Sequence, residues 1–498
     1  MKKYLFFAAA FFTAAVSHAQ QDLNTPEDAV RLANDEMNGT ARFRAMSGAF
    51  GALGGDLSAI GINPAGSAVF NYNTGTISAT NYNITNKSDY FGTSTKENDN
   101  SLELNQIGAV FVFNNMKEEA AIKKFAIGFN YDNTNNYDNT IFSAGLNPNS
   151  SIDQYFLRYA NGIGNEGGIF LDVLNNAYYE DLSFIDQQAY LGYNAYIFNP
   201  VVDSPDNTEY VTNVPAGPYY QENSVSTRGY NGKVALNFAA QLHDWLYLGA
   251  NLNVHFTDYI KTYSVYEDYE SASTGLAAVR FNNERYTYGG GFSFNLGAIA
   301  KVTEELRLGL AYESPTWNRL QDEIRQNIVA DYEGSIIITD PGMTFILDDY
   351  GLKTPSQYTG SLAYTFGSMG LLSVDYTLKD YSKTKYTSDG FDTVNSQLEN
   401  AMDLAGELRI GGELRIKNVS LRGGYRFEQS PYKNGTTIGD LNGFSAGLGF
   451  AFGNSRLDLA YAYYNRKMDA PLLTAALTDS ARINSSNNNI TLSYSLDL

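Results

Sequence analysis

Apolar and polar residues alternate along many segments of this chain, and that alternation constrains its fold more than any other feature. In a β-strand, successive side chains point to opposite faces of the sheet. Leu306, Leu308 and Leu310 therefore share one face of a strand, and Glu305 and Arg307 share the other. Such a strand suits a transmembrane β-barrel, which presents an apolar face to lipid and a polar face to its lumen.

The pattern recurs often enough to predict an all-β fold, a transmembrane antiparallel β-barrel of about fourteen strands. Strands are expected at 75–84, 104–113, 124–133, 225–241, 245–263, 285–302, 305–316, 355–367, 370–386, 403–417, 418–429, 442–453, 456–467 and 488–497. Because lipid offers the backbone no hydrogen-bond partner, a sheet that spans the membrane must close on itself.

The connections between these strands alternate between short and long. Outer-membrane barrels have short periplasmic turns and long outer loops, and fourteen strands with both ends in the periplasm need this alternation. The expected long connections are 85–103, 134–224, 264–284, 317–354, 387–402, 430–441 and 468–487. A soluble β-sandwich would also alternate along its strands, but it would not usually sort its loops so regularly.

The first nineteen residues have the form of a signal peptide. Lys2 and Lys3 precede an apolar run at 4–16, and residues 17–19, Ser-His-Ala, fit the small-x-small cleavage pattern. The apolar run is shorter than the roughly 20 residues that a spanning helix needs. We therefore expect export, a mature chain that begins near Gln20, and a barrel in the outer membrane of a Gram-negative bacterium.

Composition narrows the class of protein further. The chain has no cysteine and a formal net charge of -20, which falls to -22 when Lys2 and Lys3 leave with the signal peptide. Disulfides and thiolate chemistry are thereby excluded, and so much negative charge argues against nucleic acid as a partner. The expected partner at this stage is outer-membrane lipid, and the expected state is a monomer.

Catalysis and cofactors find no support in the sequence. The mature chain has two histidines, His243 and His255, and neither stands in a recognisable Ser-His arrangement. Metal-ligand clusters are absent, and the glycines at 48–55 lack the strand, lysine and helix of a phosphate-binding loop. We therefore expect a protein that is not an enzyme and that has no cofactor.

Residues 20–70 do not alternate and are rich in glycine and alanine from 43 to 66. A segment with this much glycine can fold back on itself with close backbone contacts. We call residues 20–70 the hatch and expect the segment to fill the lumen of the barrel, which would comprise residues 71–498 with its long outer loop at 134–224.

Here the sequence resembles the FadL-type long-chain fatty-acid and hydrocarbon transporters. The hatch residues that carry the resemblance are Arg44, Ser47, Gly48, Asp56, Asn63, Pro64 and Ala65. In the barrel, the runs 310–315, 354–364, 421–431 and 457–463 look like strands of that family. The resemblance implies a fourteen-stranded barrel that the hatch gates. It further implies that substrate meets the outer loops, enters a pocket and leaves sideways through a gap in the wall, without a built-in energy source.

Two groups of residues are candidates for a functional site. Asn63-Pro64-Ala65 is either a moving part of the hatch or an ordinary Asx-Pro turn. If Lys417-Asn418 is a tight turn, Arg409 faces Arg426 and Arg422 faces Glu413 on the lumenal side. These three arginines could bind a fatty-acid carboxylate. Alternatively, the glutamates at 407, 413 and 428 neutralise them within the wall.

Two segments leave similar alternatives open. The inward face of strand 443–453 carries only Gly, Ser and Ala, which would either leave room for an acyl chain or pack against the hatch. Loop 134–224 could capture apolar ligands on its surface, or its aromatic residues could only hold the loop together. The residues concerned are Phe156, Tyr159, Phe170, Leu174, Tyr178, Tyr179, Phe184 and Tyr190, all aromatic except Leu174.

The sequence thus favours an outer-membrane channel for the passive uptake of hydrophobic small molecules, in particular long-chain fatty acids, gated by the hatch. The alternative is a FadL-like barrel that serves as a scaffold or shuttle component in protein secretion or outer-membrane assembly. An open polar porin is the third possibility, and the expected hatch argues against it.

Overall fold

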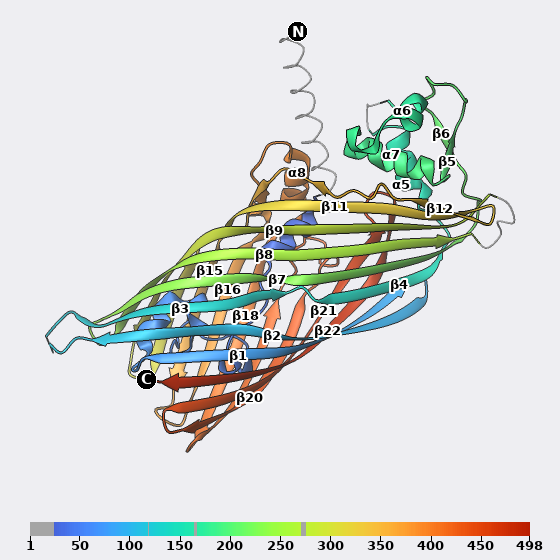
Figure 1. Ribbon diagram of the computed structural model, residues 1–498. Coiled ribbons are helices and arrows are strands. Elements are labelled where there is room, and N and C mark those ends of the chain that lie inside the picture. The colour runs from blue at the N-terminus through green and yellow to red at the C-terminus, as the bar shows by residue number, and fades with distance from the viewer. Residues whose placement is uncertain (1–23, 118, 164–166, 270–274) are drawn as a thin grey trace, which may run out of the picture.

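The computed structural model describes residues 24–117, 119–163, 167–269 and 275–498, and its main feature is a closed β-barrel (Figure 1). Each barrel strand pairs antiparallel with the next, and the last strand pairs with the first. The strands are β1 (Thr74–Tyr90), β2 (Thr93–Asn114), β3 (Ile122–Asn136), β7 (Tyr219–Leu242), β8 (Leu246–Asp268), β9 (Leu276–Lys301), β10 (Leu306–Glu313), β15 (Gln357–Thr365), β16 (Gly370–Asp380), β18 (Leu404–Ile416), β19 (Val419–Glu428), β20 (Leu441–Phe452), β21 (Ser455–Leu473) and β22 (Leu477–Asp497).

All fourteen expected strands are present, so the predicted barrel is confirmed. We call these strands the wall. The turns after β2, β7, β9, β15, β18 and β20 are short and share one end, the short-turn end, with the start of β1 and the end of β22. The expected signal peptide at 1–19 and hatch residues 20–23 lie outside the described residues.

Several connections that the sequence predicts to be long are largely strand. β1 and β2 extend through most of 85–103 and meet at a tight turn, where Phe91 and Gly92 have φ values of 43° and 82°. Segment 317–354 contains β11 (Trp317–Tyr332), β12 (Ser335–Thr339), β13 (Phe345–Ile346) and β14 (Tyr350–Lys353). We ascribe the discrepancy to position: these parts lie beyond the apolar band of the wall, where lipid no longer imposes an apolar outer face.

Along the long strands, the apolar face changes sides toward this second end, the long-loop end. In β9, Phe292 and Leu296 point outward with 43% and 50% of their surface exposed, whereas Val279 and Phe281 are fully buried. The side chains at 279 and 281 have the opposite parity and therefore face inward. The reversal shows where the strand leaves the lipid-facing band and begins to cover an apolar core of its own.

That core belongs to a helical unit at the long-loop end, which we call the cap (residues 148–218, apart from 164–166). The cap contains α5 (Asp153–Ala160), α6 (Leu171–Asn176), η2 (Tyr179–Asp181), α7 (Phe184–Asn194), β5 (Phe198–Pro200) and β6 (Tyr210–Thr212), and it follows β4 (Asn139–Asn147) (Figure 1). Phe281 meets Phe156 and Tyr155 of α5 at ring-centroid distances of 5.2 and 5.6 Å.

The aromatic residues of loop 134–224 mostly hold the cap together. Phe156, Tyr159 and Tyr179 are buried in its core together with the aliphatic Leu174. Phe184 is also buried, with its ring centre 6.4 Å from that of Tyr159. Two others remain open to solvent: Phe170 is 53% exposed and Tyr178 is 72% exposed.

The hatch crosses the lumen as short helices. They are α2 (Pro26–Ala33), α3 (Ala41–Ala45), α4 (Ala59–Ile62) and η1 (Pro64–Val69). The remaining elements, η3 (Tyr381–Lys383), β17 (Lys385–Tyr386) and α8 (Asp392–Ala401), lie between β16 and β18. None of the described helices is long and apolar enough to cross a bilayer.

A substitution in β9 tests the cap core. Phe281→Ala should weaken the packing of the cap by about 3–5 kcal/mol, because it removes a fully buried ring. The measurement is hydrogen exchange of the α5 and α7 amides. Phe292→Ala, on the same strand but facing outward, should leave their protection unchanged, and equal protection in both variants would contradict the assignment of faces.

Candidate functional site

The hatch runs along the lumen from the long-loop end to the short-turn end. At its start, the side chain of Thr25 caps α2, and the side chain of Asp28 accepts a hydrogen bond from the Thr25 backbone. Ala29, Val30 and Ala33 bury one face of α2 in an apolar cluster with wall and loop residues. The loop members are Tyr350, Leu352, Tyr381, Tyr386, Phe391, Val394, Leu398, Met402 and Tyr432.

Charged contacts fix α2 as well. Arg285 of β9 binds Asp28 at 3.1 Å, and Arg31 lies 3.5 Å from the ring centre of Tyr259. Burial alone would raise the pKa of the Asp28 carboxyl, but Arg285 and Arg31 outweigh burial and hold that pKa below its usual range. The ionised carboxylate of Asp28 therefore anchors α2 to the wall, because separating a buried ion from its partners is costly.

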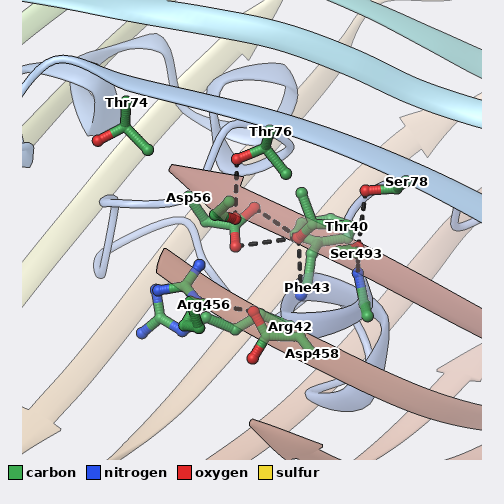
Figure 2. Close-up of polar contacts among 12 residues, drawn as sticks. Thr40, Arg42, Phe43, Asp56, Thr74, Thr76, Ser78, Arg456, Asp458 and Ser493 are labelled. Carbon is green, nitrogen blue, oxygen red and sulfur yellow. Dashed lines mark hydrogen bonds and ion pairs between the residues drawn. The ribbon is translucent and has the colours of Figure 1, made fainter. Parts of the chain in front are cut away.

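The second helix, α3, is held between the wall and the rest of the hatch (Figure 2). Thr40 donates its hydroxyl to Asp56 at 2.8 Å and accepts the Phe43 N–H at 3.1 Å, so Asp56 and Thr40 close the hatch on itself. The Ala41 N–H donates to Ser493 of β22 at 2.6 Å. Asp56, which the sequence singled out, thus bonds within the hatch.

Arg42 leaves α3 and joins a buried charge network in the wall. Its Nε lies 3.0 Å from Glu413, which also binds Arg422 at 2.6 Å. Arg422 in turn binds Asp458 at 2.7 Å. At the two ends of the network, Arg415 binds Glu413 and Arg456 binds Asp458, each at 2.6 Å. Burial opposes the charge of Arg42, but Glu413 prevails and raises the pKa of that guanidinium.

The predicted strand register is confirmed, and it explains where the lumenal arginines lie. Arg409 faces Arg426, and Glu413 faces Arg422, across β18 and β19. Arg426 is bound by Glu407 at 2.6 Å and by Glu428 at 2.8 Å. Carboxylates of the wall thus neutralise these arginines, which agrees with the alternative in which the glutamates at 407, 413 and 428 are their partners.

The network contains partners that the sequence did not reveal. They are Arg42 of the hatch and Asp458 and Arg466 of β21, none of which is next to β18 or β19 in the sequence. Arg466 binds Glu428 at 2.9 Å. Alternation placed Asp458 on a polar face, but no local pattern indicates which charges meet across the lumen.

The small inward residues of β20 pack against the hatch, so they do not leave room there for an acyl chain. Ser445 Oγ lies 2.8 Å from Ser47 Oγ and donates to the Ala45 carbonyl at 3.0 Å. A Cβ on Gly447 would lie 2.5 Å from the Ala45 Cβ. The bare face of β20 is therefore a contact surface that a larger side chain would obstruct.

Wall glycines make the same close approach elsewhere around the hatch. A Cβ on Gly309 would lie 2.3 Å from the Gly51 carbonyl oxygen, and one on Gly411 would lie 2.5 Å from the Met46 carbonyl oxygen. Real Cβ atoms do not come that close to backbone. These glycines let the hatch backbone lie directly on the wall backbone, a use of glycine that alternation alone does not show.

Asn63-Pro64-Ala65 is both a turn and a wall contact. Asn63 accepts the Ala65 N–H at 3.1 Å, as an ordinary Asx turn does. Its amide also donates to Gly51 at 2.7 Å and to the Ala298 carbonyl of β9 at 3.1 Å. The Pro64 carbonyl accepts from Asn237 of β7 at 2.9 Å.

Asp375 of β16 makes a further anchor. It is fully buried, and its Oδ2 accepts the N–H groups of Phe50 and Gly51 at 3.0 and 2.9 Å. A carboxylate that accepts two backbone N–H groups makes strong, charge-assisted hydrogen bonds. Asp375 could not be singled out from the sequence, because a lone acid on a polar strand face carries no signal of its own.

The last two of the predicted hatch residues are Arg44 and Gly48. Arg44 is 1% exposed, donates to Asn38 at 2.6 Å and lies 5.5 Å from the ring centre of Tyr82. Gly48 has a φ of +75°, which favours glycine, and a Cβ there would crowd the Phe43 ring. All seven hatch residues that carry the family resemblance are thus buried, and they contact the hatch itself or the wall.

Between the hatch and the wall remains a polar cavity of about 120 Å³. Its charged lining comes from both sides and consists of Asp35, Glu36, Asp132, Lys233, Glu313, Lys379, Glu407, Arg409, Arg426 and Glu428. Burial raises the pKa of Glu36. The cavity has room for a few waters and not for an acyl chain, so the lumen is closed here in this conformation.

The ladder between β2 and β3 is incomplete. Their backbone pairing covers Gln106–Asn114 of β2, whereas β2 itself begins at Thr93. Above the pairing, side chains bridge the seam: Asn136 donates to Ser101 at 2.8 Å. Side-chain bonds can open without breaking a backbone ladder, so this seam is a weak line in the wall.

The described residues contain no group of three or more His, Asp or Glu side chains placed to hold a metal ion. His255 contacts Ser293 at 2.8 Å on the lumenal side, and His243 lies in a short turn with a φ of 50°.

No protein-family model and no curated protein sequence matches the chain, but solved structures do. A FadL homologue of Pseudomonas aeruginosa matches with a TM-score of 0.55 and 14% identity, over 93% of this chain and 99% of that one. The toluene transporter TodX of Pseudomonas putida matches with a TM-score of 0.51 and 14% identity, over 94% of this chain and 100% of that one. At such identities the likeness establishes a shared fold.

Replacing Asp375 tests whether the hatch is held by discrete polar contacts. Asp375→Asn should weaken two charge-assisted bonds and loosen the hatch locally by about 1.5–3 kcal/mol. Hydrogen exchange at Phe50 and Gly51 should accelerate, while the amides of the wall keep their protection. Asp469→Asn, which alters a partly exposed acid outside the hatch, is the control, and unchanged exchange in Asp375→Asn would refute the anchor.

Proposed function

We propose, starting from this FadL-type fold, that the protein is an outer-membrane channel for the passive uptake of hydrophobic small molecules. The observation that carries the proposal is a closed fourteen-stranded wall whose lumen is filled by a separate N-terminal segment. An open polar porin would leave a wide aqueous lumen. Two of the solved neighbours are a FadL homologue and a toluene transporter, which favours a small hydrophobic substrate.

Gating by the hatch is the second part of the proposal. Because the cavity beside the hatch is too small for an acyl chain, passage requires the hatch to shift. Its polar contacts with the wall are hydrogen bonds and ion pairs at separate points, including Arg42–Glu413, Asn63–Ala298 and Ser47–Ser445. Separate polar contacts can exchange partners one at a time, so a shift need not unfold the wall.

Long-chain fatty acids are the proposed substrates. Arg409 and Arg426 line the cavity beside the hatch and lie on the path that a carboxylate would follow if the hatch moved. Both already have protein partners, so a carboxylate would have to compete with Glu407. The seam above Gln106, between β2 and β3, is the proposed lateral exit, since the wall there lacks a continuous backbone ladder.

An engineered disulfide tests channel and gate together. The chain has no native cysteine, and Ser47 and Ser445 place their Oγ atoms 2.8 Å apart across the hatch–wall boundary. Oxidising the double variant Ser47→Cys, Ser445→Cys should abolish uptake of labelled oleate by cells, and a reductant should restore it.

The control pair is Thr80→Cys, Thr491→Cys, whose Oγ1 atoms lie 2.8 Å apart on β1 and β22, two wall strands that already pair through their backbones. This pair should cross-link without loss of uptake. Full uptake by the oxidised 47–445 protein would contradict gating, and the absence of any gene-dependent oleate uptake would contradict the fatty-acid assignment.

A further inference from the structure

We propose that the short-turn mouth of the barrel binds the anionic headgroup, carboxylate or phosphate, of an amphiphile between Lys124, Lys301 and Arg307. The inference rests on the proposed channel function and deepens it, because it states which ligand chemistry the mouth recognises. In outer-membrane barrels the short-turn end faces the periplasm.

The mouth contains a cavity of about 710 Å³. Lys124 comes from β3, Lys301 from the end of β9 and Arg307 from the start of β10, while Lys117 and Lys123 lie at the turn between β2 and β3. Five bases thus line one cavity in a chain whose formal net charge is -20.

Lys124, Lys301 and Arg307 differ from the other lumenal cations in their partners. Arg42, Arg415 and Arg422 each bind a carboxylate at 3.0 Å or less. Within the described parts of the chain, no carboxylate forms an ion pair with any of the three proposed ligands of the anion. The acid that lines the cavity with them, Asp244, is exposed on its turn.

What the three bases do contact is neutral. Lys124 Nζ donates to the Phe70 carbonyl at 2.6 Å and to Asn71 at 3.1 Å, and Arg307 donates to the Leu53 carbonyl at 3.2 Å. Lys301 lies 5.4 Å from the ring centre of Tyr247. These contacts use hydrogen-bond donors but leave three positive charges uncompensated.

Anchoring of the hatch explains only part of this arrangement. Neutral donors could hold the Phe70 and Leu53 carbonyls equally well, and the Lys301 side chain donates no hydrogen bond to the described part of the hatch. The Nε of Arg307 is buried without a hydrogen-bond partner, and a guanidinium with a free edge suits a carboxylate or phosphate. Val69 and Tyr247 line the same cavity, so the chain of an amphiphile could lie beside its head.

The consequence for the channel is a coupling between ligand and hatch. An anion that takes donors from Lys124 and Arg307 competes with Phe70 and Leu53, which are hatch carbonyls. Binding at the mouth would therefore release the end of the hatch that joins β1.

The two tryptophans of the chain provide the test. Trp245 lies beside Asp244, and its carbonyl accepts the Lys301 backbone N–H at 2.7 Å, whereas Trp317 begins β11. In the full-length Trp317→Phe protein, stearate with a nitroxide on carbon 5 should quench Trp245 at a concentration about tenfold lower than its methyl ester. Adding Lys301→Gln and Arg307→Gln should abolish this difference.

Two control variants separate charge from folding. Lys87→Gln changes an exposed lysine of β1 and should keep the difference between acid and ester. The exchange Lys301→Arg with Arg307→Lys preserves charge and should keep it too. Equal quenching by acid and ester in the Trp317→Phe protein, or a difference that survives the Gln substitutions, would overturn the proposal.

Competition identifies the source of the anion. Displacement of the probe by inorganic phosphate would support a phosphate headgroup, and displacement only by octanoate would support a carboxylate. Gene-dependent uptake of labelled methyl oleate without acid-specific quenching would overturn the anion site and leave the channel intact. Acid-specific quenching without any gene-dependent uptake would overturn the channel and leave the site.

Discussion

Closure of the wall is the constraint on which the rest of the structure depends. Lipid cannot satisfy backbone N–H and C=O groups, so each strand must pair on both sides until β22 meets β1. Fourteen strands enclose a lumen too wide for their own side chains to fill, since about eight strands already suffice for that. Water or a second segment of the chain has to occupy the remaining space, and here the hatch does so.

The way the hatch fits follows from the same geometry. Glycines such as Gly309 and Gly411 remove side chains from the inner face, so hatch backbone rests on wall backbone. Ions and amides such as Arg42, Asn63 and Asp375 then provide separate points of attachment. A hatch held in this way is a distinct body inside the wall, which is the property that a movable gate requires.

Alternation predicted the fourteen strands because lipid imposes it, and the tight turn at Lys417-Asn418 fixed the register of Arg409 and Arg426. Beyond the lipid-facing band the apolar–polar alternation is no longer imposed, so the outer parts of β1 and β2, and β11, were expected to be loops. Partners such as Arg42 and Asp458 could not be predicted, because only the closed fold brings them together. The hatch residues from Arg44 to Ala65 were identified by the family resemblance, because no local sequence pattern indicates them.

The central claim is that the hatch closes a lumen that would otherwise be open. Ion conductance in planar bilayers tests it most directly, with the full chain compared with a variant that lacks residues 24–70 and whose barrel formation is verified by resistance to SDS. The account predicts no open-channel steps from the full chain and large, steady steps from the variant. Steady conductance by the full chain, or a silent variant with a formed barrel, would contradict it.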